Sequence, residues 1–405
     1  MVRAGSKREI CRAFLVGGLC AGTVAAVAQQ NPSHSFGPDK CGPADPAYIQ
    51  TANETGGVPL FLQRSEAGKA MQLMQESTRE NVSTLLWASA KLAGAPQVFD
   101  IPVDTVTERI TFTFSVDTKG SRLELRQPDG QEVAVGSVRT TDTELNCGRL
   151  ITVEKPQTGN WHAEVTGSGT YWLQAQVQSD IYFIKAEFVE VGGRPGHEGL
   201  FRIQGQPIAG EPATLEVSLS ASDAKTTEIA FVSTRGDVVE KVRMKVADAD
   251  REFLELTGEV ILPKVPFRVA VVGRDMKGAR FQRFDGPLFH AETVQVVPKL
   301  DFDEIGPGET RKAAFAIRNL GAARSFKMRV IDGRQFVTSF EPKQLTLGSH
   351  ETGVVQVEVG VPAGTAKIFE DDLVFVVSST TGAATSNSAV VKLTVSGNTN
   401  RQNAH

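Results

Sequence analysis

The chain has 405 residues, of which 40% are hydrophobic and 22% are charged, a composition typical of globular proteins rather than disordered chains. At roughly 100–200 residues per domain, this length predicts two to four domains. The formal net charge of −4 at pH 7 indicates a mildly acidic surface, which argues against nucleic acid and anionic membranes as partners.

The N-terminus has the pattern of a cleavable secretory signal. Four basic residues between Arg3 and Arg12 precede a run of apolar and small residues from Ala13 to Ala28. The run is too short to span a membrane comfortably, and its Ala-Val-Ala ending favours cleavage after Ala28. Residues 1–28 are therefore predicted to be a signal peptide. A short membrane anchor is the alternative.

Loss of this segment removes four basic residues and Glu9, which shifts the formal charge from −4 to −7. No later stretch of sequence approaches the ~20 apolar residues of a spanning helix. The mature protein is therefore expected to be secreted or periplasmic, with no stable membrane span.

Residues 29–95 are predicted to be an irregular leader followed by a short strand–helix unit. Pro, Gly and Ser are frequent at 29–47, and the apolar run 58–62 predicts a short buried strand. One short amphipathic helix is expected over about 66–79, the only helix of the protein. Its apolar spacing comes from Ala67, Ala70, Met71, Met74 and Thr78. Residues 82–88 fit either a continuation of this helix or a strand.

From Val98 onward the sequence predicts a mainly-β protein built from tandem β-sandwich modules. Short runs of β-branched and aromatic residues alternate with polar ones and are separated by turn residues, a pattern typical of sandwiches. Clear runs lie at 110–114, 187–191, 214–219 and 354–359. Turn formers cluster at 192–196 and at Val297-Pro298. The predicted modules are 96–191, 197–297 and 299–397, and the polar tail 398–405 is expected to be disordered.

Two cysteines, Cys41 and Cys147, remain after loss of the signal. In an oxidising compartment the simplest hypothesis is one disulfide between them, which would tie the N-terminal segment to the first sandwich. Two unpaired thiols are the alternative.

Three further motifs resemble a known family. The first consists of residues 55–57 (TGG) with the following strand and helix. The second combines residues 99–104 (FDIPVD) with 154–161 (EKPQTGNW), and the third combines Gly-x-Asp at 273–275 with Phe-Gln-Arg at 281–283. The stretch 48–297 resembles the region that begins at the end of the von Willebrand factor A domain in hemicentins and related extracellular proteins. This resemblance implies a galactose-binding-like jelly roll followed by an immunoglobulin-like sandwich, and residues 299–397 have general immunoglobulin-like features.

The departure from this family concerns metal binding. An A domain binds its ligands through a metal held by an Asp-x-Ser-x-Ser loop, and the sequence contains no such loop. Only the last strand–helix unit of an A domain is expected, within residues 29–95. Metal-dependent adhesion is therefore not carried over from the resemblance.

The sequence predicts no enzyme. None of the six histidines lies in a Gly-x-Ser-x-Gly or His-Glu-x-x-His motif, and no glycine-rich phosphate loop joins a strand to a helix. Acidic clusters at 248–250, 301–304 and 370–372 match no twelve-residue calcium loop, so solvated turns are expected and calcium sites are the alternative. No cofactor or metal is expected.

The candidate binding residues are Trp172, Gln174 and Gln176. Alternation along 171–177 places them on the polar face of a strand, opposite the apolar side chains. An exposed tryptophan beside amides suits a protein contact or a sugar platform. Alternatively, a neighbouring helix or module covers Trp172, since tryptophan is usually buried.

These features predict an exported, non-enzymatic modular protein that mediates protein–protein, cell-surface or matrix interactions. The alternative is a carbohydrate-binding protein that uses the first sandwich, with a glycan as its partner.

Overall fold

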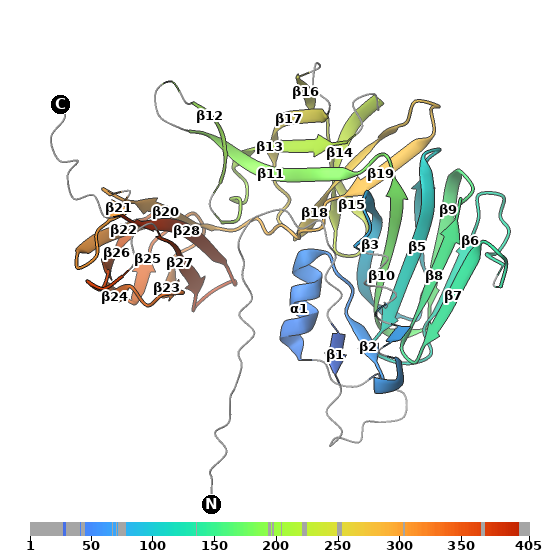
Figure 1. Ribbon diagram of the computed structural model, residues 1–405, viewed down its shortest axis with the longest axis horizontal. Coiled ribbons are helices and arrows are strands. Elements are labelled where there is room, and N and C mark those ends of the chain that lie inside the picture. The colour runs from blue at the N-terminus through green and yellow to red at the C-terminus, as the bar shows by residue number, and fades with distance from the viewer. Residues whose placement is uncertain are drawn as a thin grey trace, which may run out of the picture.

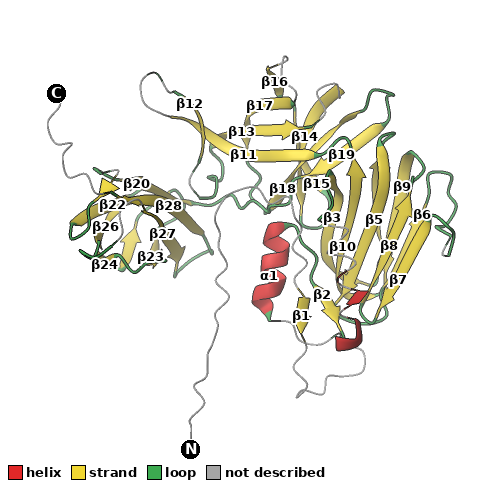
Figure 2. Ribbon diagram, in the orientation of Figure 1, coloured by secondary structure: helices red, strands yellow, loops and turns green. Residues whose placement is uncertain are grey.

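The computed structural model describes residues 27–29, 41, 45–66, 68–69, 71, 78–134, 136–192, 196, 198–203, 205–220, 225–248, 253–302, 304–365 and 369–396. Most of these residues lie in strands that pack as β-sandwiches (Figure 1 and Figure 2). The predicted mainly-β class with several sandwiches is confirmed. The galactose-binding-like assignment of the first sandwich stays a prediction.

Helix α1 (Pro46–Thr55) precedes the sandwiches. The carboxylate of Asp45 caps it by accepting the N–H of Ala47 at 2.9 Å, and the helix ends at Gly56, which has a φ of +81°. The expectation that 66–79 forms the only helix is therefore wrong. Most of 66–79 lies outside the described residues, although Gly68, Lys69 and Met71 have helical backbone.

Two short strands accompany α1. Strand β1 (Val27–Gln29) pairs in parallel with β2 (Leu60–Leu62), and the 3-10 turn η1 (Arg64–Glu66) follows. The buried strand expected at 58–62 is thus present as β2. Residues 1–26 of the predicted signal lie outside the described residues, and Val27 and Ala28 begin β1.

The first sandwich packs a five-strand segment of one sheet against a smaller sheet of three strands. The segment has the order β3-β10-β5-β8-β7, and the smaller sheet has the order β4-β9-β6. The strands are β3 (Val82–Ala93), β4 (Gln97–Val103), β5 (Thr107–Val116), β6 (Arg122–Arg126), β7 (Thr140–Leu145), β8 (Gly148–Glu154), β9 (Gly159–Thr166) and β10 (Ser168–Ser179). The ambiguous residues 82–88 are therefore a strand, in contact with β10 along its length.

The second sandwich contains a five-stranded sheet of order β12-β11-β13-β17-β16 and a four-strand segment of order β15-β14-β18-β19. Its strands are β11 (Phe183–Gly192), β12 (Gly199–Arg202), β13 (Pro212–Leu219), β14 (Lys225–Ser233), β15 (Val238–Val242), β16 (Lys245–Asp248), β17 (Leu254–Ile261), β18 (Phe267–Arg274) and β19 (Arg280–Phe284). Because β19 pairs with β3 at Phe284 and Thr84, the first two sandwiches share one nine-stranded sheet.

Strand pairing differs from the module boundaries expected from turn residues. Strand β3 lies in the first sandwich, although the expected leader included it. Strand β11 pairs with β13 of the second sandwich, although the boundary at 192–196 assigned it to the first. That cluster of turn formers lies between β11 and β12, inside a hairpin rather than between modules.

The third sandwich packs the sheet β20-β22-β26-β24 against β21-β28-β27-β23-β25. Its strands are β20 (Val294–Lys299), β21 (Glu304–Ile305), β22 (Thr310–Asn319), β23 (Arg324–Asp332), β24 (Val337–Glu341), β25 (Gln344–Leu347), β26 (Thr352–Gly360), β27 (Phe369–Ser379) and β28 (Ser386–Val395). Between the sheets, Phe315 and Phe375 stack with ring centroids 4.3 Å apart.

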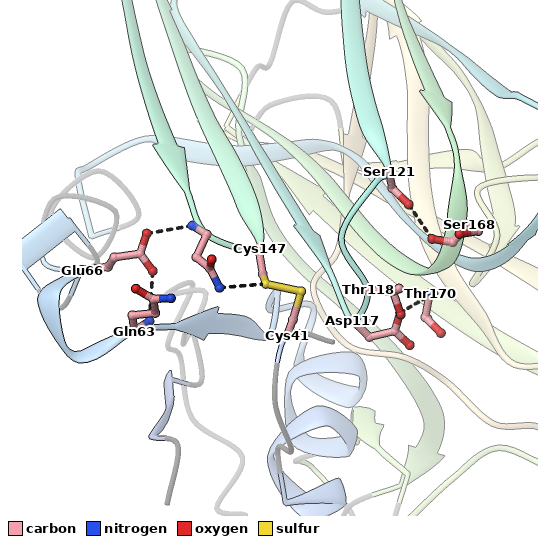
Figure 3. Close-up of a disulfide and its surroundings, with 10 residues drawn as sticks. Cys41, Gln63, Glu66, Asp117, Thr118, Ser121, Cys147, Ser168 and Thr170 are labelled. Carbon is pink, nitrogen blue, oxygen red and sulfur yellow. Dashed lines mark hydrogen bonds between the residues drawn. A yellow bond between two sulfur atoms is a disulfide. The ribbon is translucent and has the colours of Figure 1, made fainter. Parts of the chain in front are cut away.

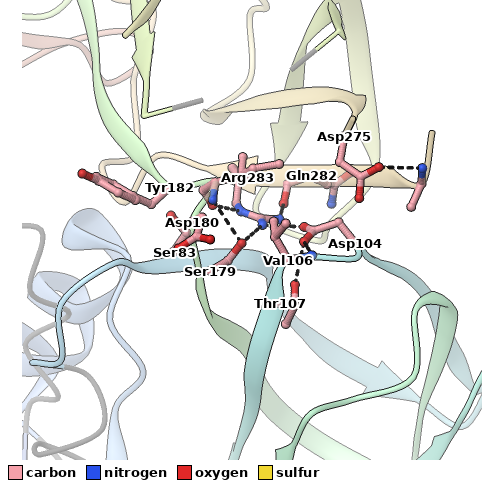
Figure 4. Close-up of polar contacts among 12 residues, drawn as sticks. Ser83, Asp104, Val106, Thr107, Ser179, Asp180, Tyr182, Asp275, Gln282 and Arg283 are labelled. Carbon is pink, nitrogen blue, oxygen red and sulfur yellow. Dashed lines mark hydrogen bonds and ion pairs between the residues drawn. The ribbon is translucent and has the colours of Figure 1, made fainter. Parts of the chain in front are cut away.

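A buried guanidinium fixes the first sandwich to the second (Figure 4). Arg283 of β19 donates from Nη2 to the carboxylate of Asp104 and, at 2.8 Å, to the hydroxyl of Ser179, while its Nε donates to the carbonyl of Ile181 at 2.6 Å. Arg283 and Asp104 are both fully buried side chains. Two buried charges remain stable only when they are paired and hydrogen-bonded, so these contacts require one placement of the two sandwiches.

The neighbouring Asp275 makes a second contact of the same kind. Its carboxylate accepts the backbone N–H of Thr105 at 2.9 Å and the Thr105 hydroxyl at 2.6 Å. Asp275 and Arg283 are the polar residues of the Gly-x-Asp and Phe-Gln-Arg motifs. In this structure, the two motifs therefore join the second sandwich to the first.

Helix α1 lies where these two sandwiches meet. The guanidinium of Arg268, in β18, stacks 4.0 Å from the ring centroid of Trp87, in β3, and donates to the carbonyls of Asn53 and Gly286. Burial lowers the pKa of Arg268 to about 10, which leaves the group charged at neutral pH. A cation near the C-terminal end of a helix also complements the helix dipole. The helix end is thus held by strands of both sandwiches.

A histidine contact adds to this attachment. The side chains of His290 and Glu54 meet at 2.8 Å, and the N–H of Leu288 donates to the Glu54 carbonyl at 2.9 Å. The hydrogen bond with Glu54 raises the pKa of His290 above its ordinary value.

Reciprocal hydrogen bonds join the third sandwich to the second. Asn387 accepts the N–H of Gln206 at 2.8 Å and donates to the Gln206 carbonyl at 3.0 Å. The carboxylate of Glu292 accepts the Thr385 hydroxyl at 2.6 Å and the Ser386 N–H at 3.0 Å. Specific polar contacts therefore link all three sandwiches.

The variant Arg283→Met should destabilise the protein by about 3–5 kcal/mol, because it leaves the Asp104 carboxylate buried without its cation. Urea unfolding measures this change. The control Arg280→Met, at an exposed position of the same strand, should shift the free energy of unfolding by less than about 0.5 kcal/mol. Equal effects of the two substitutions would contradict a structural role for the buried pair.

The variant His290→Gln should lower the melting temperature more at about pH 5.5 than at about pH 8.5. The pKa of His290 is higher in the folded protein than in the unfolded chain. Its contact with Glu54 therefore stabilises the fold fully below the unfolded pKa, and this stabilisation is lost as the pH rises through the folded pKa. Thermal unfolding at the two pH values measures the difference. Glu54→Gln should cause the same pH-dependent decrease in melting temperature, and the double variant should cause no larger decrease. If the decreases caused by the two single variants add up in the double variant, the contact between His290 and Glu54 is not their cause.

Candidate functional site

The residues proposed for binding from the sequence lie together in the structure, but they are covered. Trp172, Gln174 and Gln176 share one face of β10, as alternation predicted, and each is less than a tenth exposed. The indole N–H of Trp172 donates to the Asn53 side chain of α1 at 3.0 Å. The ring centroids of Trp172 and Phe61 are 5.6 Å apart. The expectation of an exposed tryptophan is therefore wrong.

The amide of Gln174 shows why this face is polar. Its Nε2 donates to the carbonyl of Gly56 at 2.8 Å, and the Trp87 indole donates to the next carbonyl, of Gly57, at 3.0 Å. Gly56 itself approaches the Gly286 backbone so closely that an added Cβ would lie 2.4 Å from the Gly286 oxygen. These side chains satisfy the backbone of the segment that covers them. A sugar platform at Trp172 is not supported.

A disulfide anchors the covering segment to the first sandwich (Figure 3). Cys41 and Cys147 are bonded, and the Cys41 N–H donates to the Asp117 carbonyl at 3.0 Å. C-terminal to α1 in the chain, the Glu66 carboxylate accepts the N–H of Asn146 at 2.7 Å and that of Gln63 at 2.9 Å. The segment that bears α1 and β2 is thus tied to the β7–β8 end of the sandwich at two points.

A partly exposed apolar row lies on the third sandwich. Val297, Ala316 and Val354 are directly opposite one another on β20, β22 and β26, where Val297 and Val354 are exposed and Ala316, between them, is buried. Val297 is 41% exposed and Val354 is 46% exposed. The sequence pattern does not predict this row, because its three residues lie on three separate strands. They can be identified as neighbours only when the register of these strands is known.

Basic residues flank this apolar row. Lys299 follows Val297 on the outer side of β20, and Lys312 and Arg318 lie on the outer side of β22. An apolar centre with a charged rim is the composition of many protein interfaces. We call the apolar row together with these three basic residues the β20–β22–β26 face.

Metal chemistry finds no support in the described part of the chain. No group of three or more His, Cys, Asp or Glu side chains is placed there to hold a metal ion. Residues 249–250 and 303, in two of the acidic clusters, lie outside the described residues. Among the described helices, none has the length and apolar character needed to cross a membrane.

Comparisons with known proteins identify the third sandwich most clearly. The family model described as the VWA7 Ig-like domain matches residues 296–397. Human von Willebrand factor A domain-containing protein 7 is 24% identical over 254 residues, which cover 58% of this chain and 28% of that protein. The rat protein of the same name is 24% identical over 281 residues, which cover 64% of this chain and 31% of that protein.

The chain thus spans less than a third of the length of these curated relatives. Among solved structures, the fibronectin(III)-like modules of Clostridium thermocellum CbhA share 12% identity with a TM-score of 0.18, covering 54% of this chain and 98% of theirs. That TM-score is too low for the likeness to bear on function.

The von Willebrand factor A-related part of the resemblance is confirmed, and its hemicentin part stays a prediction. The immunoglobulin-like match and the resemblance to the curated relatives fit a non-enzymatic modular protein. The chain contains a VWA7-like region, and its residues 296–397 match the VWA7 Ig-like domain.

Proposed function

We propose that the chain is an exported, non-enzymatic modular protein that binds a protein partner through the β20–β22–β26 face. The observation that carries this proposal is the apolar row across three strands in which the exposed Val297 and Val354 flank Ala316, within the residues that match the VWA7 Ig-like domain. A sandwich fold alone does not specify a function, so the proposal depends on the side chains of this outer surface.

The composition of the face suggests the chemistry of the partner. Apolar side chains at its centre lose water on binding and supply most of the affinity, while charges at the rim give specificity. Lys299, Lys312 and Arg318 make most of that rim basic in a chain of net charge −4, although Glu358 lies directly opposite Lys312. The partner should therefore present an apolar centre bordered by acidic residues.

The disulfide supports export. Cys41 and Cys147 are separated by 106 positions and are bonded in the structure. Structural disulfides persist in secreted and periplasmic compartments and are rare in the reducing cytosol. This agrees with the signal-like pattern of residues 1–28.

Export predicts two chemical properties of the protein recovered from its natural source. Its N-terminus should be Gln29, and neither Cys41 nor Cys147 should react with an alkylating reagent before reduction. Mass spectrometry of the intact and reduced protein measures both. A protein that retains residues 1–28 in the cytoplasm, with both thiols reactive, would show that the chain is not exported.

Partner binding predicts that Val354→Glu weakens association by more than about 10-fold, because it places an unpaired charge in an apolar contact. The immobilised chain would be exposed to secreted and cell-surface proteins of the source organism. Each captured protein would then be purified and its affinity for the parent chain and the variant compared.

The matched control is Val238→Glu, which makes the same change at an exposed valine of β15 in the second sandwich. It should leave the affinity unchanged, and both variants should melt near the parent temperature. If every captured partner tolerates Val354→Glu and Val297→Glu as well as it tolerates the control, the β20–β22–β26 face is not the binding surface.

A further inference from the structure

The hairpin formed by β11 and β12 carries an open sheet edge. Strand β12 is the terminal strand of its sheet, and all four of its residues are exposed. In Figure 1 this hairpin extends beyond the part of β11 that pairs with β13. Proteins usually protect such edges, because their unpaired N–H and C=O groups can pair with another strand.

The backbone bonding of β12 shows which groups are available. Ile203 donates its N–H to the Phe188 carbonyl at 2.9 Å, so Ile203 faces β11. Hydrogen-bonding direction alternates along a strand, so Phe201 and Gly199 also face β11. The N–H and C=O groups of residues 198, 200 and 202 therefore point away from β11, towards the open edge.

These outward groups are self-complementary. In an antiparallel pair of two β12 strands centred on Leu200, Leu200 lies opposite the same residue of the second copy, and Glu198 lies opposite Arg202. Every outward N–H and C=O of the three positions then bonds to the other copy, since all three pairs are of the hydrogen-bonded type. Both terminal pairs join opposite charges, which favours this pairing.

The side chains fit the same register. Leu200 is 46% exposed and lies opposite Val191, which is 81% exposed, so the pairing would gather four apolar side chains on one face. On the other face, Phe201 would lie opposite Gly199 of the second copy. Phe201 already lies beside Gly192 of its own hairpin, where an added Cβ would be 3.2 Å from the ring.

Other registers lose these contacts. A shift by one residue sets outward groups opposite groups that already bond to β11, so the ladder cannot form. A shift by two residues sets Leu200 opposite Arg202 and leaves Glu198 without its basic partner. The sequence around β12 therefore favours the register centred on Leu200.

We propose that two copies of the chain associate by antiparallel pairing of β12 with β12, centred on Leu200. The contact is short, so it falls at the small end of specific interfaces and gives a weak, reversible dimer. The dimer does not depend on the proposed partner or on the β20–β22–β26 face, and its test requires the purified chain alone.

Charge reversal tests the register. Sedimentation of the purified full chain should show conversion from monomer to dimer as its concentration rises. Arg202→Glu sets two acids opposite each other at both ends of the pair, and Glu198→Arg sets two bases there. Each single variant should weaken association by more than about 10-fold, and the double variant Glu198→Arg/Arg202→Glu should return it to within about 3-fold of the parent.

The control Val238→Glu, on strand β15 at the edge of the nine-stranded sheet, should leave the dimer intact. All changed residues are on the surface, so circular dichroism should match the parent. Arg202→Glu should melt at a somewhat lower temperature, because the charge of Arg202 also acts on the buried Asp285. If the chain stays monomeric up to about 1 mM, the proposal is wrong, and the β12 edge is then free to pair with a strand of another protein. Single variants that still dimerise, or a double variant that does not recover, overturn it equally.

Discussion

The arrangement of this protein depends on the burial of the Arg283 guanidinium. A buried cation is costly unless its donors are satisfied. Here Asp104 and Ser179 of the first sandwich accept from Arg283, as does the carbonyl of Ile181 in the connection from β10 to β11. A hinge motion at this junction would separate the charges inside an apolar environment. The two sandwiches therefore behave as one body, and the pairing of β19 with β3 continues their shared sheet through the junction.

This fixed junction determines where α1 lies and, through it, which surfaces stay open. Arg268 reaches from the second sandwich to the end of α1, while Trp172 and Gln174 reach it from the first. A helix held from both sides covers the polar face of β10 permanently. Residues that look like a binding site in the sequence serve instead to hold the cover, so the two contacts proposed for this chain lie elsewhere, on the outer face of the third sandwich and at the β12 edge.

The sequence predicted those features that depend on local pattern. Period-two alternation of apolar and polar residues located strands such as β5, β13 and β26. Strand β26 buries one face, whereas the alternating polar residues of β5 are buried as well. Helix α1 was missed, although Asp45 and Pro46 form a recognisable start, because it buries only Ala52 and has no apolar stripe. The cover over Trp172 was offered only as an alternative, because alternation identifies a face but not the segment, 119 residues away, that packs on it. The Arg283–Asp104 pair spans 179 residues and has no local signal.

The two proposed contacts use different parts of the chain, and their separation has a physical consequence. The β12 edge belongs to the second sandwich, and the β20–β22–β26 face belongs to the third, which hydrogen bonds from Gln206 and Glu292 hold to it. Pairing through β12 would therefore bring two copies of the face into one assembly. Two linked sites raise the effective concentration of the second binding event when both can engage one surface. A weak contact at each face would then give durable attachment to a partner displayed in many copies, and a much shorter contact with a partner that is monomeric in solution.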